Sequence, residues 1–206
     1  MTTQLLFATR LYRAELAGSP GGDALMEDLA DVCAMMAQED EAGQAWSEAH
    51  HYPGYTSYAS PGPLWTRASA MADLKKQLDR HAKAFAADLG LDLADGRLRL
   101  DNLWVNVLEP GGTHTGHIHP HSVISGTVYV VVPQGASGLK LEDPRLPMMM
   151  AAPGRLADAP QDQQTFVYVS PVGGTLLMWE SWLRHEVPAN AAETERVSIS
   201  FNYGWR

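Results

Sequence analysis

Four of the eight histidines in this 206-residue chain lie within one short stretch: His114, His117, His119 and His121. Side chains two residues apart on a strand point to the same face, about 6–7 Å apart along the chain. The imidazoles of His117 and His119, which we expect to enter a strand, could therefore meet at one point, as two ligands of one metal must. Histidine is a common ligand of zinc, iron, copper and nickel. The pattern favours a metal site over a turn of solvated histidines.

A third ligand and an anion-binding group follow later in the chain. His185 lies between two β-rich segments, and Arg196 opens a segment that alternates strictly between apolar and polar residues. On a solvated edge strand the polar face would merely meet water. In a small barrel it would point inward, placing a guanidinium and the hydroxyl of Ser198 in the cavity, a combination that suits a carboxylate. The apolar face holds Val197, Ile199 and Phe201; the polar face holds Arg196, Ser198, Ser200 and Asn202.

These segments resemble the iron(II)- and 2-oxoglutarate-dependent dioxygenases, and in particular one branch of 2-oxoglutarate/Fe(II) oxygenases. The similarity runs through residues 117–130, 143–145, 174–187 and 196–202, about half of the chain, with a weaker likeness in residues 6–12. The resemblance implies a mainly β fold with flanking helices around a double-stranded β-helix, or jelly-roll, core. It also implies an Fe(II) centre, 2-oxoglutarate as co-substrate, dioxygen, and a substrate that it does not identify.

The metal ligands depart from the wider superfamily in one respect. The usual iron site combines two histidines with one carboxylate, but the carboxylate position here is occupied by His119. One reading keeps three imidazoles as ligands: His117, His119 and His185. The other completes the site with a carboxylate from elsewhere, Asp143 or Glu186. We favour the three histidines because the branch that the chain resembles also has histidine at that position.

The resemblance places the far carboxylate of 2-oxoglutarate at Arg196 and Ser198. Three further residues are candidate contacts of the co-substrate because they lie on segments with strand periodicity: Asn106, Ser125 and Tyr129. Asn106 could equally lie on a solvated edge, and Tyr129 could equally be a core aromatic with a tethered hydroxyl.

Composition narrows the function classes. A net charge of −9, with only 15 lysines and arginines spread along the chain, argues against a nucleic-acid surface. The single Cys33 cannot form an internal disulfide, which fits a reducing compartment. No run approaches the roughly 18 apolar residues of a membrane span. We therefore expect a cytoplasmic protein, and the sequence leaves a homodimer open.

The element pattern predicts one domain over residues 1–206, with helical support in about 1–95 and the β-helix core in about 97–206. We expect an opening strand, a helix that Asp23 caps, an irregular aromatic-rich loop and a long helix, at 4–15, 23–36, 43–63 and 66–89. Strands follow at 102–108, 126–132, 139–142, 165–169, 175–179 and 196–202. Residues 146–164 read as an insertion over the barrel mouth, either a methionine-bearing substrate lid or a mobile surface loop.

The function that these features favour is a non-haem Fe(II)- and 2-oxoglutarate-dependent dioxygenase acting as a hydroxylase. Two alternatives stay open. The first is a cupin-type metalloprotein that does not use 2-oxoglutarate; the spacing of Gly111, His117 and His119 fits the start of a cupin motif, but Val123 and Ile124 stand where its glutamate is expected. The second is a non-catalytic β-barrel binding protein whose histidines serve only structure.

Overall fold

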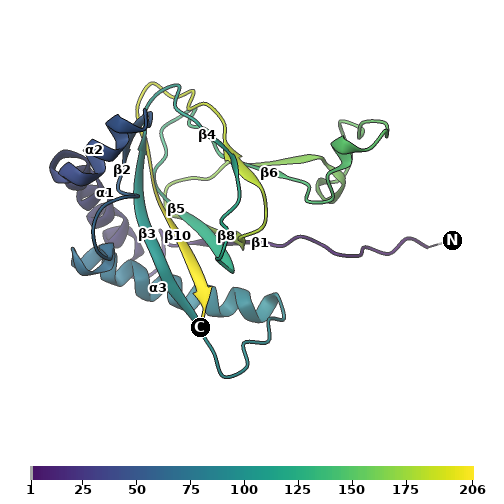
Figure 1. The fold of residues 1–206 in the computed structure, drawn as a ribbon, viewed down its shortest axis with the longest axis horizontal. Helices are drawn as coiled ribbons and strands as arrows, with labels where there is room; N and C mark the ends of the chain where they lie inside the picture. The colour runs from purple at the N-terminus through teal and green to yellow at the C-terminus, as the bar shows by residue number, and fades with distance from the viewer. Residues whose placement is uncertain (1) are drawn as a thin grey trace.

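The computed structural model describes residues 2–206 and contains two antiparallel sheets (Figure 1). Side chains from both sheets line a cavity between them. The larger sheet has the strand order β1 (Leu11–Glu15), β8 (Thr175–Glu180), β5 (Ile124–Val131), β10 (Arg196–Trp205), β3 (Leu98–Leu108) and β2 (Gly54–Thr56). The smaller sheet has the order β4 (His114–His117), β9 (His185–Val187), β6 (Leu139–Glu142) and β7 (Phe166–Val169). This is the mainly β, double-stranded β-helix architecture that the sequence predicted.

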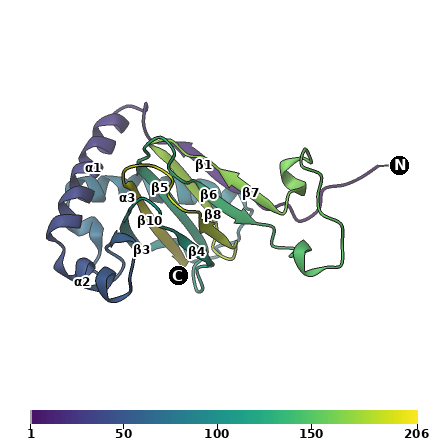
Figure 2. The same cartoon turned by 90° about the horizontal axis from the view of Figure 1, so that it is seen from above.

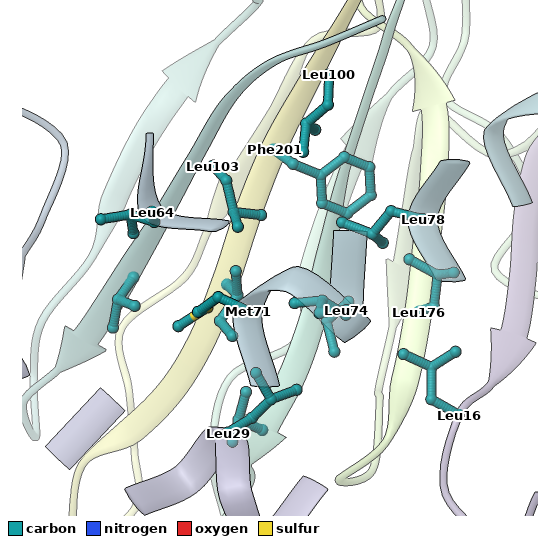
Figure 3. Close-up of a cluster of buried hydrophobic side chains, with 14 of the residues drawn as sticks. Leu16, Leu29, Leu64, Met71, Leu74, Leu78, Leu100, Leu103, Leu176 and Phe201 are labelled. Atoms are coloured by element: carbon teal, nitrogen blue, oxygen red, sulfur yellow. The ribbon is translucent and has the colours of Figure 1, made fainter. Parts of the chain in front are cut away.

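Helices cover the outer face of the larger sheet (Figures 1 and 2). They are α1 (Gly22–Glu39), α2 (Glu41–Ala49) and α3 (Ser69–Asp88), with 3-10 turns η1 (Leu64–Thr66), η2 (Pro147–Met149) and η3 (Gln161–Gln163). The predicted apolar face of α3 is fully buried at Met71, Leu74 and Phe85. It packs with Leu29 and Leu176 in the main core between helices and sheet (Figure 3). No helix among residues 2–206 combines the length and the apolar character that crossing a bilayer requires.

Strand β10 shows why one sheet can serve both a core and a polar cavity. Successive side chains of a strand point to opposite faces. Ile199 and Phe201 are fully buried in the helix-facing core, whereas Arg196, Ser198 and Ser200 line the cavity between the sheets. The inward orientation of the polar face, which the sequence left as one of two options, is therefore the one that the structure adopts.

Several boundaries differ from the sequence-based expectations. The opening strand begins at Leu11, and α2 occupies the first part of the segment expected to be an irregular loop. Gly43 lies inside α2, at a position where a Cβ would come within 2.7 Å of the Tyr55 ring. Asp23 does not cap α1: the cap is Gly21, at φ 75°, and the Asp23 carboxylate accepts a hydrogen bond from the Gly18 amide (2.7 Å).

The N-terminal part is also more than helical support, because it contributes β1 and β2 to the larger sheet. The expected insertion at 146–164 projects away from the body together with the N-terminal tail (Figure 1). Its methionines, Met148 to Met150, are exposed, and none of its residues lines the cavity between the sheets. The structure therefore does not show it as a lid over this cavity.

The close packing of β5 against β10 gives a test of the fold. A Cβ at Gly126 would clash with the Phe201 ring and with the Leu177 carbonyl oxygen. Overpacking of this kind costs about 1–3 kcal/mol, so Gly126→Ala should lower the free energy of unfolding in urea by that amount. Gly154→Ala is the control, since nothing lies within 4 Å of its Cβ position. Equal unfolding midpoints for the two variants would contradict the packing described.

Candidate metal centre

The cavity between the sheets measures about 70 Å³ and contains most of the residues that the sequence singled out. β4 and β9 pair so that His117 stands directly opposite His185. His119 follows the end of β4, and its backbone N–H donates to the Ser181 carbonyl (3.0 Å). The two histidines of the His-x-His pair therefore leave a strand, where we expected them to enter one, yet both side chains line the cavity.

The three imidazoles converge. One ring nitrogen from each of His117, His119 and His185 lies within 4.8 Å of the others, which makes them, within residues 2–206, the cluster of three that could hold a metal. The Nε2 atoms of His119 and His185 are 3.2 Å apart. The ring centroids of His117 and His185 are separated by 4.4 Å. Adjacent nitrogens aimed at one point fit a shared cation.

The surroundings keep these imidazoles in the form that binds metals. Burial lowers the pKa of His119 to about 4 and that of His185 to about 3, so both are neutral at pH 7. The Nδ1 of His185 lies 2.8 Å from the Leu183 carbonyl, and that of His117 lies 2.6 Å from the Thr115 carbonyl. Each Nδ1–H then donates to a carbonyl and leaves Nε2 with a free lone pair, the usual outer support of a metal-bound histidine.

Neither alternative carboxylate reaches the cluster. The Arg145 guanidinium donates to both carboxylate oxygens of Asp143 (2.8 and 2.9 Å). Glu186 points away because side chains alternate along β9, and it accepts a hydrogen bond from Lys140 (2.6 Å). His121 is exposed, at φ 68°, and lies outside the cluster. These pairings favour three imidazole ligands over a carboxylate from Asp143 or Glu186.

A second polar feature of the same cavity is a buried cation. The Arg196 side chain is only 2% exposed and forms no ion pair within residues 2–206. Its Nε and the Tyr129 hydroxyl are buried without a hydrogen-bond partner, and the guanidinium lies 4.8 Å from the centre of the Tyr129 ring. Buried charges are normally paired. An unpaired guanidinium beside a free hydroxyl is therefore suited to an anionic ligand, and Ser198 lines the same cavity.

The remaining candidates divide. Asn106 lines the cavity, with its amide held by Thr56 (2.9 Å) and Ser200 (3.1 Å). Ser125 does not line it; its hydroxyl is hydrogen-bonded to Ser181 and Asn202.

The register explains this placement of Ser125. It stands opposite Asn202, six residues from Arg196 and so about 20 Å along β10. Tyr129, by contrast, stands opposite Ser198, close to the guanidinium.

Sequence reasoning missed two residues near Arg196. The hydroxyl of Tyr52 and the Nε2 of His114 are 2.6 Å apart, and burial together with the Arg196 charge lowers the pKa of His114 to about 4. The histidine-rich stretch and the aromatic-rich segment were visible signals, but their pairing spans 62 residues.

Two indoles flank the cluster of three histidines: Trp104 stacks on His119 (6.0 Å between centroids), and Trp179 meets His185 edge-on (4.7 Å).

Solved structures share this fold. A prolyl-4-hydroxylase from Pseudomonas putida has a TM-score of 0.62 and 20% identity, covering 95% of this chain and 93% of that one. The non-heme alpha ketoglutarate dependent epimerase SnoN from nogalamycin biosynthesis has a TM-score of 0.64 and 14% identity, covering 96% and 77%. HygX from Streptomyces hygroscopicus, solved with nickel and 2-oxoglutarate, has a TM-score of 0.58 and 14% identity, covering 96% and 82%. No curated protein matches the sequence.

The family described as "Putative 2OG-Fe(II) oxygenase" matches residues 102–202, about half of the chain. That region spans the three converging histidines and the buried arginine. Its donor set of three imidazoles suits Fe(II), and its unpaired guanidinium suits a carboxylate. On the sequence match and the shared fold, the chain belongs to the 2OG-Fe(II) oxygenases, which are oxidoreductases that use iron and 2-oxoglutarate.

Proposed function

We propose that His117, His119 and His185 hold the Fe(II), and that Arg196, with Ser198 and Tyr129, binds the far carboxylate of 2-oxoglutarate. The observation that carries this assignment is the unpaired guanidinium in the same small cavity as three converging imidazoles. A cupin-type protein without 2-oxoglutarate would leave the buried charge of Arg196 unexplained, and so would a purely structural role for the histidines.

The reaction that we infer is the hydroxylation of a C–H bond. When bound, iron and 2-oxoglutarate supply the oxidation: one atom of dioxygen enters succinate as CO₂ is released, and the other enters the substrate. The residues of the chain position the metal ligands and the co-substrate and shield them from water. Carbonyls of Thr115 and Leu183 fix two imidazoles, Arg196 orients the diacid, and the indoles of Trp104 and Trp179 limit water beside the ligands.

Two finer expectations from the sequence stay predictions. We infer a cytoplasmic location from the single Cys33, which is free and cannot form an internal disulfide. A homodimer remains a proposal; the apolar side chains exposed on the N-terminal tail and the projecting segment, such as Phe7 and Met149, are where a second copy could pack.

The ligand assignment predicts how metal binding responds to mutation. Anaerobic protein should bind about one Fe(II) per chain, and His117→Ala, His119→Ala and His185→Ala should each abolish binding, as measured by calorimetry and metal analysis. His121→Ala is the matched control from the same stretch and should bind normally, because its side chain is exposed outside the cluster. Iron loss in His121→Ala with retention in His117→Ala would make the assignment wrong.

The all-histidine ligand set can be tested separately. Asp143→Asn and Glu186→Gln should keep the Fe(II) affinity within several-fold, because both carboxylates pair with cations outside the cavity. A hundredfold loss of affinity in either variant would instead reveal a ligand or an essential supporting group.

A substitution of Arg196 should weaken the binding of 2-oxoglutarate and leave the binding of Fe(II) unchanged. A desolvated, charge-assisted contact of this kind is worth about 2–4 kcal/mol, so Arg196→Met should weaken anaerobic 2-oxoglutarate binding about 30- to 1000-fold while Fe(II) stays bound. Ser198→Ala should cost about 1 kcal/mol. Ser125 is a buried serine outside the cavity and serves as the matched control; Ser125→Ala should leave the affinity for 2-oxoglutarate unchanged. Binding would be followed by the visible metal-to-ligand band; unchanged affinity in Arg196→Met would refute this role.

A further inference from the structure

Part of the edge of β3 has no partner strand. β2 pairs only with Asn106, Val107 and Leu108. At Val105 the backbone N–H and C=O that point away from β10 are both hydrogen-bonded to Ser57. The Ser57 N–H donates to the Val105 carbonyl (3.0 Å), and the Ser57 hydroxyl accepts from the Val105 N–H (2.8 Å). Outward backbone groups recur at every second residue of an antiparallel strand. The next outward pair belongs to Leu103, and no strand within residues 2–206 lies beside it there.

A groove of about 750 Å³ follows this open edge. One wall is formed by residues 99–104 of β3, and the other by the segment 57–65. Figure 1 shows the chain after β2 leaving the side of β3 and curving towards α3. Five residues of strand extend for about 17 Å, so the edge from Arg99 to Leu103, which contains a β-bulge at Asp101, is long enough for a short extended peptide.

Trp104 lines both the groove and the metal cavity. On the cavity side its indole stacks on His119, and on the groove side Tyr58 meets it edge-on at 5.7 Å. A residue paired opposite Trp104 on an added strand would have its side chain on the same face of the sheet, with Cβ atoms about 4.5–5.5 Å apart. That side chain would lie at the entrance of the cavity.

On the basis of the function proposed above, we propose that the primary substrate is an extended peptide segment that adds to the open edge of β3. Its backbone exchanges hydrogen bonds with Leu103, and one of its side chains passes Trp104 to the metal cavity. Hydroxylation then replaces one C–H hydrogen of that side chain with a hydroxyl, and 2-oxoglutarate and dioxygen supply the oxidising equivalents and the oxygen atom.

The chemistry of the edge selects this substrate class. A free N–H and C=O on one strand residue are complementary to another peptide backbone, and edge pairing of this kind is a recurring mode of peptide recognition. Exposed edges are usually covered or blocked because they attract strands. A nucleic acid does not fit a chain with a net charge of −9. The exposed ring of Tyr58 offers an apolar surface for a side chain of the peptide.

The test uses a synthetic library of random ten-residue peptides, incubated with the iron-loaded enzyme, 2-oxoglutarate and ¹⁸O₂. Mass spectrometry should find peptides that gain one ¹⁸O atom. The best substrate is then remade with a methyl group on each backbone nitrogen in turn. We expect turnover to fall about tenfold or more where the nitrogen faces Leu103. Methylation at the next residue should be tolerated, because only every second N–H points to the edge.

A readout independent of turnover is amide hydrogen exchange. With Mn(II) in place of iron, a saturating amount of the selected peptide should slow exchange of the Leu103 amide. Tyr58→Ala should raise the KM for the peptide about tenfold, whereas Tyr168→Ala, an equally exposed tyrosine on β7 (64% against 62%), should leave it unchanged.

These experiments distinguish a failure of the peptide-substrate proposal from a failure of the proposed oxygenase function. An enzyme that makes succinate but modifies no peptide overturns the peptide substrate and leaves the oxygenase standing. Modified peptides that tolerate methylation at every nitrogen, with no protection of Leu103, overturn the edge pairing. Failure of the iron-loaded enzyme to make any succinate would count against the proposed function itself.

Discussion

The structure is organised around a charge that the protein itself leaves unpaired. Transferring a guanidinium from water to a protein interior is costly unless it is paired, and Arg196 is buried without a carboxylate partner in residues 2–206; the Tyr129 face offsets only part of that cost. The position is held because β10 is a central strand, paired on both sides by β5 and β3, with Ile199 and Phe201 locked in the helix-facing core. The hydrophobic core on one face of the strand thus stabilises an anion site on the other.

The three histidines complete the electrostatic design of the cavity. Neutral imidazoles bring no negative charge, so a divalent metal bound to them would keep its full charge. A cavity with this metal and the guanidinium of Arg196 presents two centres of positive charge. A diacid such as 2-oxoglutarate complements both, one carboxylate at each. A carboxylate ligand would reduce this attraction, and Asp143 and Glu186 are instead held in ion pairs with Arg145 and Lys140.

Strand periodicity explains what could be read from the sequence. Alternation along residues 196–202 correctly placed Arg196 and Ser198 on one face, and the spacing of His117 and His119 correctly suggested a shared cavity. What failed depended on register and on distant contacts. Ser125 has the right face but lies too far along β5, and the Tyr52–His114 pair joins segments 62 residues apart. Helix α2 was missed because it occupies only the first part of an aromatic-rich segment, and the close packing of Gly43 on Tyr55 is a distant contact that a local pattern does not reveal.

The central claim is that three imidazoles and no carboxylate hold the iron beside a cradle for a diacid. X-ray absorption spectroscopy of the anaerobic Fe(II) protein tests it most directly, because multiple scattering from imidazole rings counts the histidine ligands. The account predicts three imidazoles and no protein carboxylate, with additional oxygen scattering at the iron when 2-oxoglutarate is added. A spectrum that requires only two imidazoles together with a protein carboxylate, or one that 2-oxoglutarate leaves unchanged, would contradict it.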